Sequence, residues 1–429
     1  GVVFRRGLCH LLCDQQKKIE PGMSEVDVVI IGAGAAGLGA ARTLQRLGKS
    51  FVLLEASHRI GGRAYTEEVR PGVPFDLGCH WLHSASLNPF VKIADELGVT
   101  YTKDGFPRNC FENGRWVSAE EIEEWEAFFD AQFTVTARFT ETGRDASVFD
   151  VTERESRWTP AFDYILSLYA SMDVDQISAA DLISYRDTEE NWPLKDGYGT
   201  LISRFGADVP VTLNAAVSEI DWTGPRIRAT SSKGTVSADA VLITVSTGIL
   251  GAGDIRFTPA LPDWKLEAVA NLPLGNHNRI CLVFDRDVFG PDVPAGFMAI
   301  TGDEVPMSFH VRPYGFDYVV GVTGGRFADW LERAGQQASV GYATEKLVSV
   351  FGSDVAKHIT GHNVTAWRGD PWVKGAYANA LPGQFHQRAK LAEPINGRLY
   401  FAGEATHPEF FTTAHGAYLS GIAAAERLA

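Results

Sequence analysis

The chain has 429 residues, 45% of them hydrophobic and 21% charged, which is an ordinary composition for a globular protein and leaves room for two sizeable domains. Its formal net charge of −14 argues against nucleic acid as a partner and would favour encounter with cationic molecules. No apolar run approaches the roughly 20 residues that span a bilayer, so we expect a soluble, cytoplasmic protein with no membrane partner.

Residues 1–23 differ in character from the rest of the chain, and we expect an extension that is non-native or disordered. Gly1 is no initiator, whereas Met23 would open the next region cleanly. Arg5 and Arg6 precede a short apolar patch, but His10 interrupts it, so vector-derived or mis-started sequence is favoured over a twin-arginine export signal.

Residues 28–55 read as a strand, a glycine turn, a helix, a second strand and an acid. Gly32 allows the tight turn, Gly34 lets the backbone approach a pyrophosphate, and Gly37 lets the helix pack closely on the strand. Glu55 is placed to accept a hydrogen bond from a ribose 2′-hydroxyl. Glycines used for packing alone are the alternative, but every part falls in register, so the pattern predicts a dinucleotide site.

Further elements are expected along the chain. Residues 119–140 place bulky apolar side chains at helical spacing, which predicts a helix with a core-packing stripe. Short alternating strands are expected between residues 209 and 246, and 278–284 reads as a strand of a second sheet. A last strand at 399–402 leads into a helix that begins near Ala414. The core-packing stripe of the helix expected at 119–140 consists of Ile122, Trp125, Phe128, Phe129 and Phe133.

The cysteines give no metal or redox spacing, and their odd total of 5 argues against a disulfide framework. We therefore expect reduced thiols and no metal site. They are Cys9, Cys13, Cys79, Cys110 and Cys281.

Several motifs together carry a resemblance. Arg59-Ile60-Gly61-Gly62-Arg63 directly follows the acid, where an arginine suits paired phosphate oxygens. The chain then contains FDLGCHWLH at 75–83, WRGDPW at 367–372, YFAGEAT at 400–406 and TAHGAYLSG at 413–421. In this order the segments resemble the flavin-containing amine oxidase family, whose members include monoamine oxidases, polyamine oxidases and flavin-dependent histone lysine demethylases.

The resemblance implies an α/β fold. A Rossmann-type FAD-binding domain of the amine oxidase and glutathione-reductase-like kind is interleaved with a substrate domain of mixed sheet plus helices. We expect the FAD-binding domain to comprise 24–90, 196–268 and 370–429, and the substrate-binding domain 91–195 and 269–369.

The resemblance also implies the cofactor contacts. Ala376 stands where several members carry a flavin-linked cysteine, so FAD should be bound noncovalently. The last helix should point its N-terminus at the flavin, where its N–H groups would stabilise negative charge. Glu404 could instead cap its own helix, and Val217 and Trp367 could be core residues. The expected contacts are Gly32, Gly34, Ala36, Gly37, Glu55, Ala56, Gly62, Arg63, Leu77, Gly78, Val217, Trp367, Gly403, Glu404, Thr413 and Ala414.

The resemblance implies fewer residues on the substrate side of the site than on the cofactor side. Tyr377 matches one wall of the family's aromatic pair around the substrate nitrogen, whereas Thr413 replaces the other wall. His83 could meet a second nitrogen of a polyamine, and Glu189 or Glu190 a distal ammonium, although a structural histidine and solvated acids are the plain alternatives. The catalytic candidates are Arg279, Tyr377, His83, Thr413 and Trp367.

Arg279 is the main departure from the family pattern, which usually has a lysine tied through a water to flavin N5. Arginine keeps the positive charge but not the compact, deprotonatable head of lysine. Rapid reoxidation by O2 is therefore in question, and a dehydrogenase with another acceptor is the alternative. Arginine could also bind a carboxylate bidentately, which would move the substrate toward amino acids.

The expected function is an FAD-dependent amine oxidase. Hydride passes from the carbon next to an amine nitrogen to flavin N5, the imine hydrolyses to a carbonyl compound, and O2 becomes hydrogen peroxide. The substrate is a small polyamine or other amine, and the oligomeric state is left open. Alternatives are a flavoenzyme acting on C–C bonds, a histone demethylase, and an FAD-fold escort protein that binds without catalysis.

Overall fold

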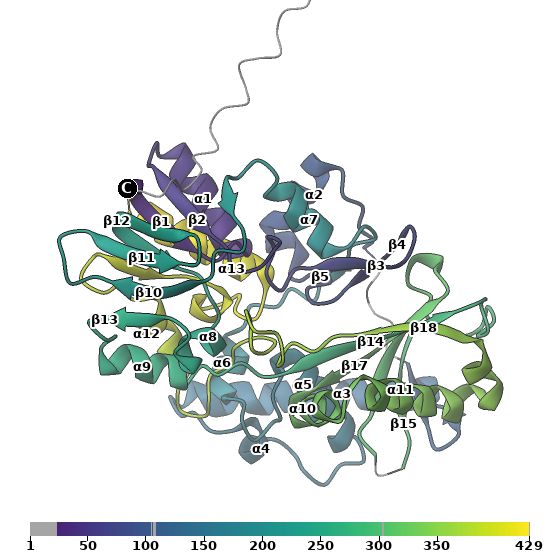
Figure 1. Ribbon diagram of the computed structural model, residues 1–429. Helices are drawn as coiled ribbons and strands as arrows, with labels where there is room; N and C mark the ends of the chain where they lie inside the picture. Colours follow the sequence, from purple (N-terminus) through teal and green to yellow (C-terminus); the bar gives the residue numbers. More distant parts are fainter. Residues whose placement is uncertain (1–23, 104, 106–108, 303, 429) are drawn as a thin grey trace, which may run out of the picture.

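The computed structural model describes residues 24–428 except 104, 106–108 and 303 (Figure 1). The expectations for residues 1–23, including Cys9 and Cys13, lie outside this part of the chain. Cys79, Cys110 and Cys281 are free thiols, as expected. No described helix combines the length and apolar character that crossing a membrane requires.

The first sheet is built around β1 (Ser24–Ile31), which lies parallel between β2 (Phe51–Leu54) and β12 (Gly234–Ile243). From Val28 to Ile31, alternate residues of β1 enter two different core clusters, because successive side chains point to opposite faces. The strand order is β13-β10-β11-β12-β1-β2-β9, and β19 pairs with the end of β12. The remaining bounds are β9 Val211–Thr212, β10 Val217–Asp221, β11 Ile227–Ser231, β13 Arg256–Thr258 and β19 Leu399–Phe401.

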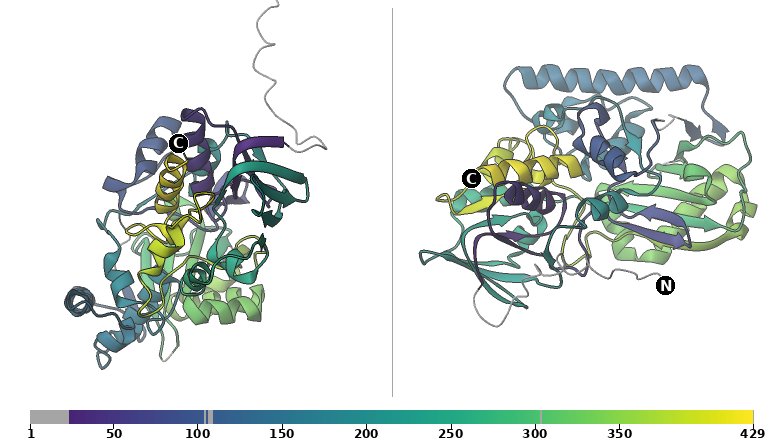
Figure 2. Two further views of the ribbon diagram at one scale, coloured as in Figure 1. Left: turned by 90° about the vertical axis from the view of Figure 1, so that its left-hand side faces the viewer. Right: turned by 90° about the horizontal axis from the view of Figure 1, so that it is seen from above.

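Two helices from opposite ends of the chain, α1 (Ala35–Arg46) and α13 (Ala414–Glu426), pack together beside this sheet (Figure 2). Their contact requires glycine. A Cβ at Gly421 would lie 2.0 Å from the carbonyl oxygen of Ala36, and one at Gly39 would lie 2.7 Å from the ring of Tyr418. The backbones therefore approach each other closely.

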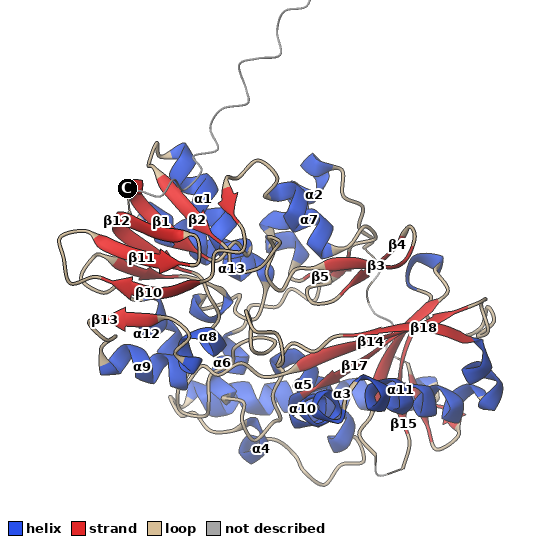
Figure 3. Ribbon diagram, in the orientation of Figure 1, coloured by secondary structure: helices blue, strands red, loops and turns tan. Residues whose placement is uncertain are grey.

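The second sheet has the order β18-β14-β17-β16-β15-β6-β7 and is mixed, because β6 runs parallel to β15 while the other pairs are antiparallel. The side chains of α11 pack with those of the central strands in one core cluster. Helices and sheets are separated by colour in Figure 3. The bounds are β6 Cys110–Glu112, β7 Arg115–Trp116, β14 His277–Phe284, β15 Gly296–Ile300, β16 Met307–Val311, β17 Tyr318–Gly324, β18 Ile359–Val364, α10 Gly325–Ala334 and α11 Gln336–Phe351.

Smaller elements connect the two sheets. The strands are β3 (Thr66–Arg70), β4 (Val73–Asp76), β5 (Trp81–Leu82) and β8 (Trp192–Pro193). The helices are α2 Pro89–Leu97, α3 Ala119–Glu141, α4 Val148–Val151, α5 Thr159–Ala170, α6 Ala179–Ser184, α7 Tyr198–Phe205, α8 Thr247–Ala252, α9 Asp263–Ala270 and α12 Gln387–Ala392. Short 3-10 turns are η1 Ala85–Leu87, η2 Pro313–Gly315, η3 Ser353–His358 and η4 Glu404–Thr406.

The predicted α/β class and element order are confirmed. The helix expected at 119–140 is α3, the strand expected at 278–284 is β14, and the last strand and helix are β19 and α13. The strands of the first sheet all fall within the segments proposed for the FAD-binding domain, and those of the second within the substrate-domain segments. The domain boundaries themselves stay a prediction.

The contact between α1 and α13 gives a stability prediction. Gly421→Ala should lower the unfolding free energy by about 1–3 kcal/mol, because the added methyl group has no space against Ala36. Gly341→Ala in α11 is the matched control: no atom lies within 4 Å of its Cβ position, so it should gain about 0.4–1 kcal/mol. Thermal unfolding checks both, and equal effects at the two sites would contradict the packing argument.

Candidate functional site

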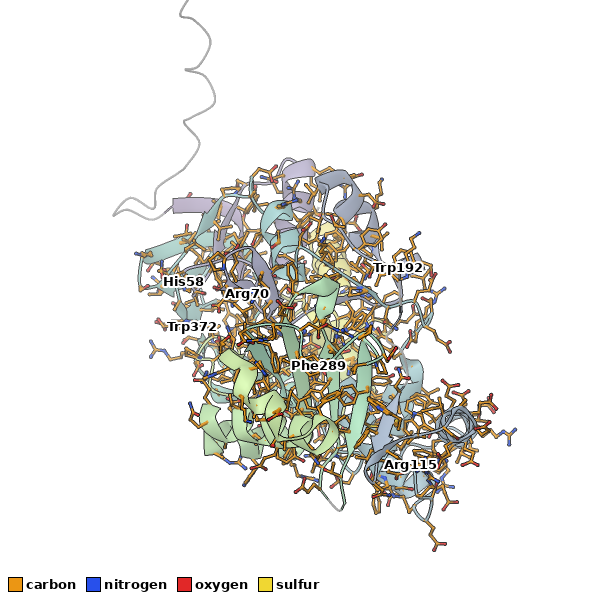
Figure 4. The ribbon with its side chains drawn as sticks, turned by 90° about the vertical axis from the view of Figure 1, so that its right-hand side faces the viewer. His58, Arg70, Arg115, Trp192, Phe289 and Trp372 are labelled. Atoms are coloured by element: carbon orange, nitrogen blue, oxygen red, sulfur yellow. The ribbon has the colours of Figure 1, made fainter. Side chains whose placement is uncertain are left out.

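One continuous cavity of about 1350 Å³ runs from the glycine turn to the second sheet. It exceeds the roughly 300–1,000 Å³ typical of small-ligand pockets, so it has room for more than one small molecule. Figure 4 shows His58 and Trp372 at one edge of the molecule and Trp192 at the other. Trp372 lines the cavity, and so do Ser57 and Asn191, which precede His58 and Trp192 in the chain.

The glycine turn forms the first end of the cavity, and each glycine has a different surrounding. Gly32 has φ +100°, and a Cβ at Gly37 would lie 1.9 Å from the carbonyl oxygen of Gly32. A Cβ at Gly34 would meet nothing within 4 Å, and Gly34 lines the cavity. Gly32 and Gly37 are thus required by the protein's own backbone, whereas Gly34 leaves space for a ligand at the start of α1, where free N–H groups suit an anion.

Glu55 is buried beside this turn. Its Oε2 accepts a hydrogen bond from the Ala33 N–H at 2.6 Å, and its Oε1 accepts one from Ser57 N–H at 2.8 Å. Burial raises the pKa of the Glu55 carboxyl, although these bonds oppose the shift. Ala56 and Val217 line the same end of the cavity. The ribose contact of Glu55 and the adenine contact of Val217 stay predictions.

Farther along, Arg63 and Glu404 form an ion pair in the cavity wall. Nη1 of Arg63 lies 2.9 Å from Oε1 of Glu404 and donates to the carbonyl oxygen of Ala376 at 2.5 Å. Glu404 also accepts hydrogen bonds from the N–H groups of Ala378 and Thr412. Arg63 therefore has a structural partner in addition to any phosphate contact, and Glu404 joins separate segments instead of capping η4, which has no side-chain cap.

The N-terminus of α13 opens onto the cavity through Thr413 and Ala414. The Thr413 hydroxyl accepts a hydrogen bond from Gly416 N–H at 3.0 Å, and the first turn carries no acid. Positive charge from the helix dipole is therefore not neutralised by a side chain of that turn. Thr413 is the N-cap of α13, a position that favours a small hydroxyl residue.

Trp367 and Tyr377 are held rigidly in the wall. The indole N–H of Trp367 donates to the carbonyl oxygen of Leu77 at 3.0 Å, and a Cβ at Gly78 would lie 3.1 Å from its ring. The Tyr377 hydroxyl donates to the Leu168 carbonyl oxygen and lies 3.0 Å from Nδ1 of His277. The Trp367 indole cannot turn without losing its bond, and the two contacts of Tyr377 fix the position of its hydroxyl.

These features fit an extended dinucleotide such as FAD. Space opens at Gly34, two helix N-termini reach the same cavity, and of the cofactor contacts expected from the sequence all except Gly37 line it. Gly37 serves the packing of α1 instead, as its spacing predicts. The individual contacts stay predictions.

Arg279 is the most unusual residue of the site. It lies on β14, lines the cavity, and is only 6% exposed. Its Nε is buried without a hydrogen-bond partner among the described residues, and its guanidinium lies 5.6 Å from the Phe75 ring centre. Burial lowers the pKa of Arg279. A buried guanidinium is costly unless it is paired, so Arg279 is poised for a partner in the cavity.

Imidazoles surround this cation. His277 shares a strand face with Arg279, two residues away, and burial lowers the His277 pKa to about 4. Nδ1 of His83 lies 2.5 Å from Oδ1 of Asn191, and burial also lowers the pKa of His83. His80 and His310 complete the set lining the cavity. Sequence reasoning missed His277 and His310 as site residues, although the alternation of β14 could have indicated His277.

The wall nearer the outside is aromatic and acidic. Trp125, Phe129 and Phe133 of α3, expected as core packing, do pack with other apolar side chains but also line the cavity. Glu189 lines it, whereas the Glu190 carboxylate accepts the N–H of Ser86 at 3.1 Å and is not part of the lining. Asp130 and Asp187, which the sequence analysis did not single out, are exposed lining residues.

Comparisons with known proteins agree on the family. A family model described as flavin containing amine oxidoreductase matches residues 122–429, and one described as an NAD(P)-binding Rossmann-like domain matches 30–97. Polyamine oxidase 3 of Oryza sativa subsp. japonica is 30% identical, covering 93% of this chain and 88% of its own length. Probable polyamine oxidase 4 of Arabidopsis thaliana is 29% identical over 98% of this chain and 89% of its own length.

More distant relatives share the same region. Lysine-specific histone demethylase 2 of Homo sapiens is 27% identical over 94% of this chain but only 53% of its own length. Among solved structures, wild-type putrescine oxidase bound to putrescine has a TM-score of 0.79 at 19% identity, with 94% of this chain and 99% of that chain covered. This structural similarity establishes the fold.

The glycine turn gives a binding prediction. Gly34→Ala should fold with unchanged thermal stability in the apoprotein, since no atom lies within 4 Å of its Cβ position. It should weaken FAD binding by roughly tenfold or more, about 1.4 kcal/mol, because the methyl group occupies ligand space. Titration of apoprotein with FAD measures this, and unchanged affinity would refute the proposed approach of a pyrophosphate to Gly34.

Proposed function

Because the chain belongs to the flavin-containing amine oxidoreductase family, we propose that it oxidises a cationic amine of the polyamine type at the carbon next to nitrogen. The chain is thus a flavin-dependent oxidoreductase acting on amines, which favours catalysis over the escort-protein alternative. FAD supplies the hydride acceptor when bound. The imine product would leave and hydrolyse to a carbonyl compound, and O2 would be reduced to hydrogen peroxide.

The observation that carries the proposal is the single cavity that joins the glycine turn to Tyr377 and Arg279. Tyr377 can present its ring to the substrate at a defined position, because its hydroxyl is bound to Leu168 and His277. A ring face attracts a cationic amine and orients its nitrogen. Thr413 lines the same cavity, and its small side chain in place of a second ring would leave a half-cage with room for a substituted nitrogen.

Electrostatics support a substrate that arrives charged and reacts neutral. The exposed Asp130, Asp187 and Glu189 on the outer wall would attract an ammonium. Deeper in the cavity, the positive charge of Arg279 disfavours an ammonium and lowers the pKa of a nearby amine. A neutral nitrogen has the lone pair that hydride removal requires.

Arg279 also supports a second candidate. Its Nε has no partner among the described residues, and a substrate carboxylate would satisfy the guanidinium bidentately. The substrate would then be an amino acid, and the electron acceptor could differ from O2. The polyamine interpretation is preferred because the outer wall is acidic and the polyamine oxidase relatives span nearly the full chain.

The main proposal predicts which compounds reduce the enzyme. Anaerobic mixing with monoamines, polyamines and amino acids should bleach the flavin absorbance with polyamines, and air should restore it with release of peroxide. Bleaching by amino acids alone would favour the second candidate. If none of the compounds reduces the flavin, the proposed amine oxidation is wrong.

Substitution of Arg279 separates its two possible roles. If the arginine limits reaction with O2, Arg279→Lys should speed reoxidation by about tenfold, equivalent to about 1.4 kcal/mol of barrier. If it binds a carboxylate, Arg279→Gln should weaken amino-acid binding by about 1.5–3 kcal/mol and leave polyamine binding much less affected. Stopped-flow reoxidation and ligand titration measure the two effects, and unchanged values in both would exclude both roles.

A further inference from the structure

An aspartate–histidine pair lies in the wall of the same cavity. Nδ1 of His80 lies 2.8 Å from Oδ2 of Asp76, and the two side chains are 7% and 1% exposed. Asp76 ends β4, and His80 lies in the loop that leads to β5. His80 lines the cavity together with Arg279.

Asp76 is fixed by the protein on its other oxygen. Oδ1 accepts hydrogen bonds from the Thr66 hydroxyl at 2.5 Å and from Tyr198 N–H at 2.8 Å. Its remaining oxygen therefore faces His80. Since a carboxylate only accepts, the proton of neutral His80 resides on Nδ1, and Nε2 keeps a free lone pair.

The charged surroundings of His80 come from several elements. Arg279 on β14 and His310 on β16 face it across the cavity wall, and His83 follows it at the end of β5. Burial, then Arg279, lowers the pKa of His80, while Asp76 opposes this shift. Burial and Arg279 therefore favour the neutral imidazole, which is the form that can accept a proton, while Asp76 favours the protonated form.

The partner of His80 differs from those of two other cavity histidines. His83 has the neutral amide of Asn191, and His277 has the hydroxyl of Tyr377. In His80 a positive imidazolium would lie against a buried carboxylate, which stabilises it. This pairing is the arrangement in which an orienting acid supports a general base.

We propose that His80, held by Asp76, is the base that takes the proton from the substrate's ammonium before oxidation, an inference that rests on the proposed function. The N–H bond of the ammonium breaks, its electron pair stays on nitrogen, and the proton binds Nε2 of His80. Total charge is unchanged: the positive charge moves from the substrate to the imidazolium beside Asp76. The freed lone pair then forms the C=N bond as hydride leaves the neighbouring carbon. Asp76 acts as a positioning residue.

The proposal has a definite pH signature. In wild type, kcat/KM should fall as the pH drops through the pKa of His80, because the protonated imidazole can no longer accept. Without this base the enzyme depends on amine molecules that are already neutral in solution. The neutral fraction of the amine rises about tenfold per pH unit below the amine pKa. The difference in kcat/KM between a His80 variant and the wild type should therefore shrink as the pH rises. A merely structural loss would be independent of pH.

His80→Gln tests this with anaerobic flavin-reduction rates from about pH 6 to pH 10, using an amine that reduces the wild type. We expect a loss of about 10²-fold or more near neutral pH, convergence with wild type at high pH, and partial rescue by a fluorinated amine of lower pKa. Asp76→Asn should behave similarly, because an amide can donate to Nδ1 and place the proton on Nε2. The control is His358→Gln: His358 pairs with Asp285 at 3.0 Å but does not line the cavity, so its profile should match wild type.

A loss that is the same at every pH, or no loss, overturns the role of His80. If no amine reduces the flavin of the wild-type enzyme, the proposed function itself is wrong. The 15N chemical shifts of His80 in the wild-type holoenzyme, assigned by comparison with His80→Gln, provide a readout that needs no turnover and no folded Asp76 variant. They should show a protonated Nδ1 and an unprotonated Nε2; a protonated Nε2 overturns the proposal.

Discussion

The candidate site depends on one buried carboxylate, that of Glu404, which joins segments far apart in the chain. It pairs with Arg63 at 2.9 Å and accepts hydrogen bonds from the N–H groups of Ala378 and Thr412. A buried ion pair adds little net stability, because removing two charges from water costs about as much as their attraction returns. The pair instead fixes positions. The loop after the glycine turn, the loop of Tyr377 and the segment before α13 all donate hydrogen bonds to the two carboxylate oxygens of Glu404.

A second ion pair extends this constraint toward the substrate side. Arg388 binds Asp181 of α6 bidentately, with both contacts at 2.6 Å, and it also donates to the carbonyl oxygens of Ala378 and Ala405. Asp181 in turn accepts the Ala380 N–H. Tyr377 is thus fixed on one side by main-chain bonds to two charged networks and on the other by its hydroxyl. A rigid wall of this kind would let the proposed half-cage orient a substrate that a flexible ring would not.

Local patterns explain how much could be predicted from the sequence. The turn at Gly32 and Gly34, the strand β14 and the helix α13 are encoded by residues that are adjacent in the chain, and the structure has them where the patterns place them. The Asp181–Arg388 pair joins residues 207 apart, and no local pattern marks either partner. That the aromatic rings of α3 both pack in the core and line the cavity could not be predicted either. Helical spacing identifies a buried face but does not distinguish a face covered by protein from one that lines a cavity.

The position of Arg279 links the chemistry of the substrate to that of the cofactor. A buried cation raises the free energy of any second cation beside it, so the proposed ammonium substrate, attracted by the acidic outer wall, would be driven to lose its proton as it approaches. The same charge lowers the free energy of an anion. In the proposed reaction, deprotonation would remove positive charge from the ammonium and reduction would add negative charge to the flavin, and Arg279 favours both changes from one position. Hydride loss itself returns positive charge to the substrate as the C=N bond forms, and Arg279 does not favour that change. Lysine could supply that charge as well, but only while protonated; arginine, with its higher intrinsic pKa, keeps the charge over a wider pH range.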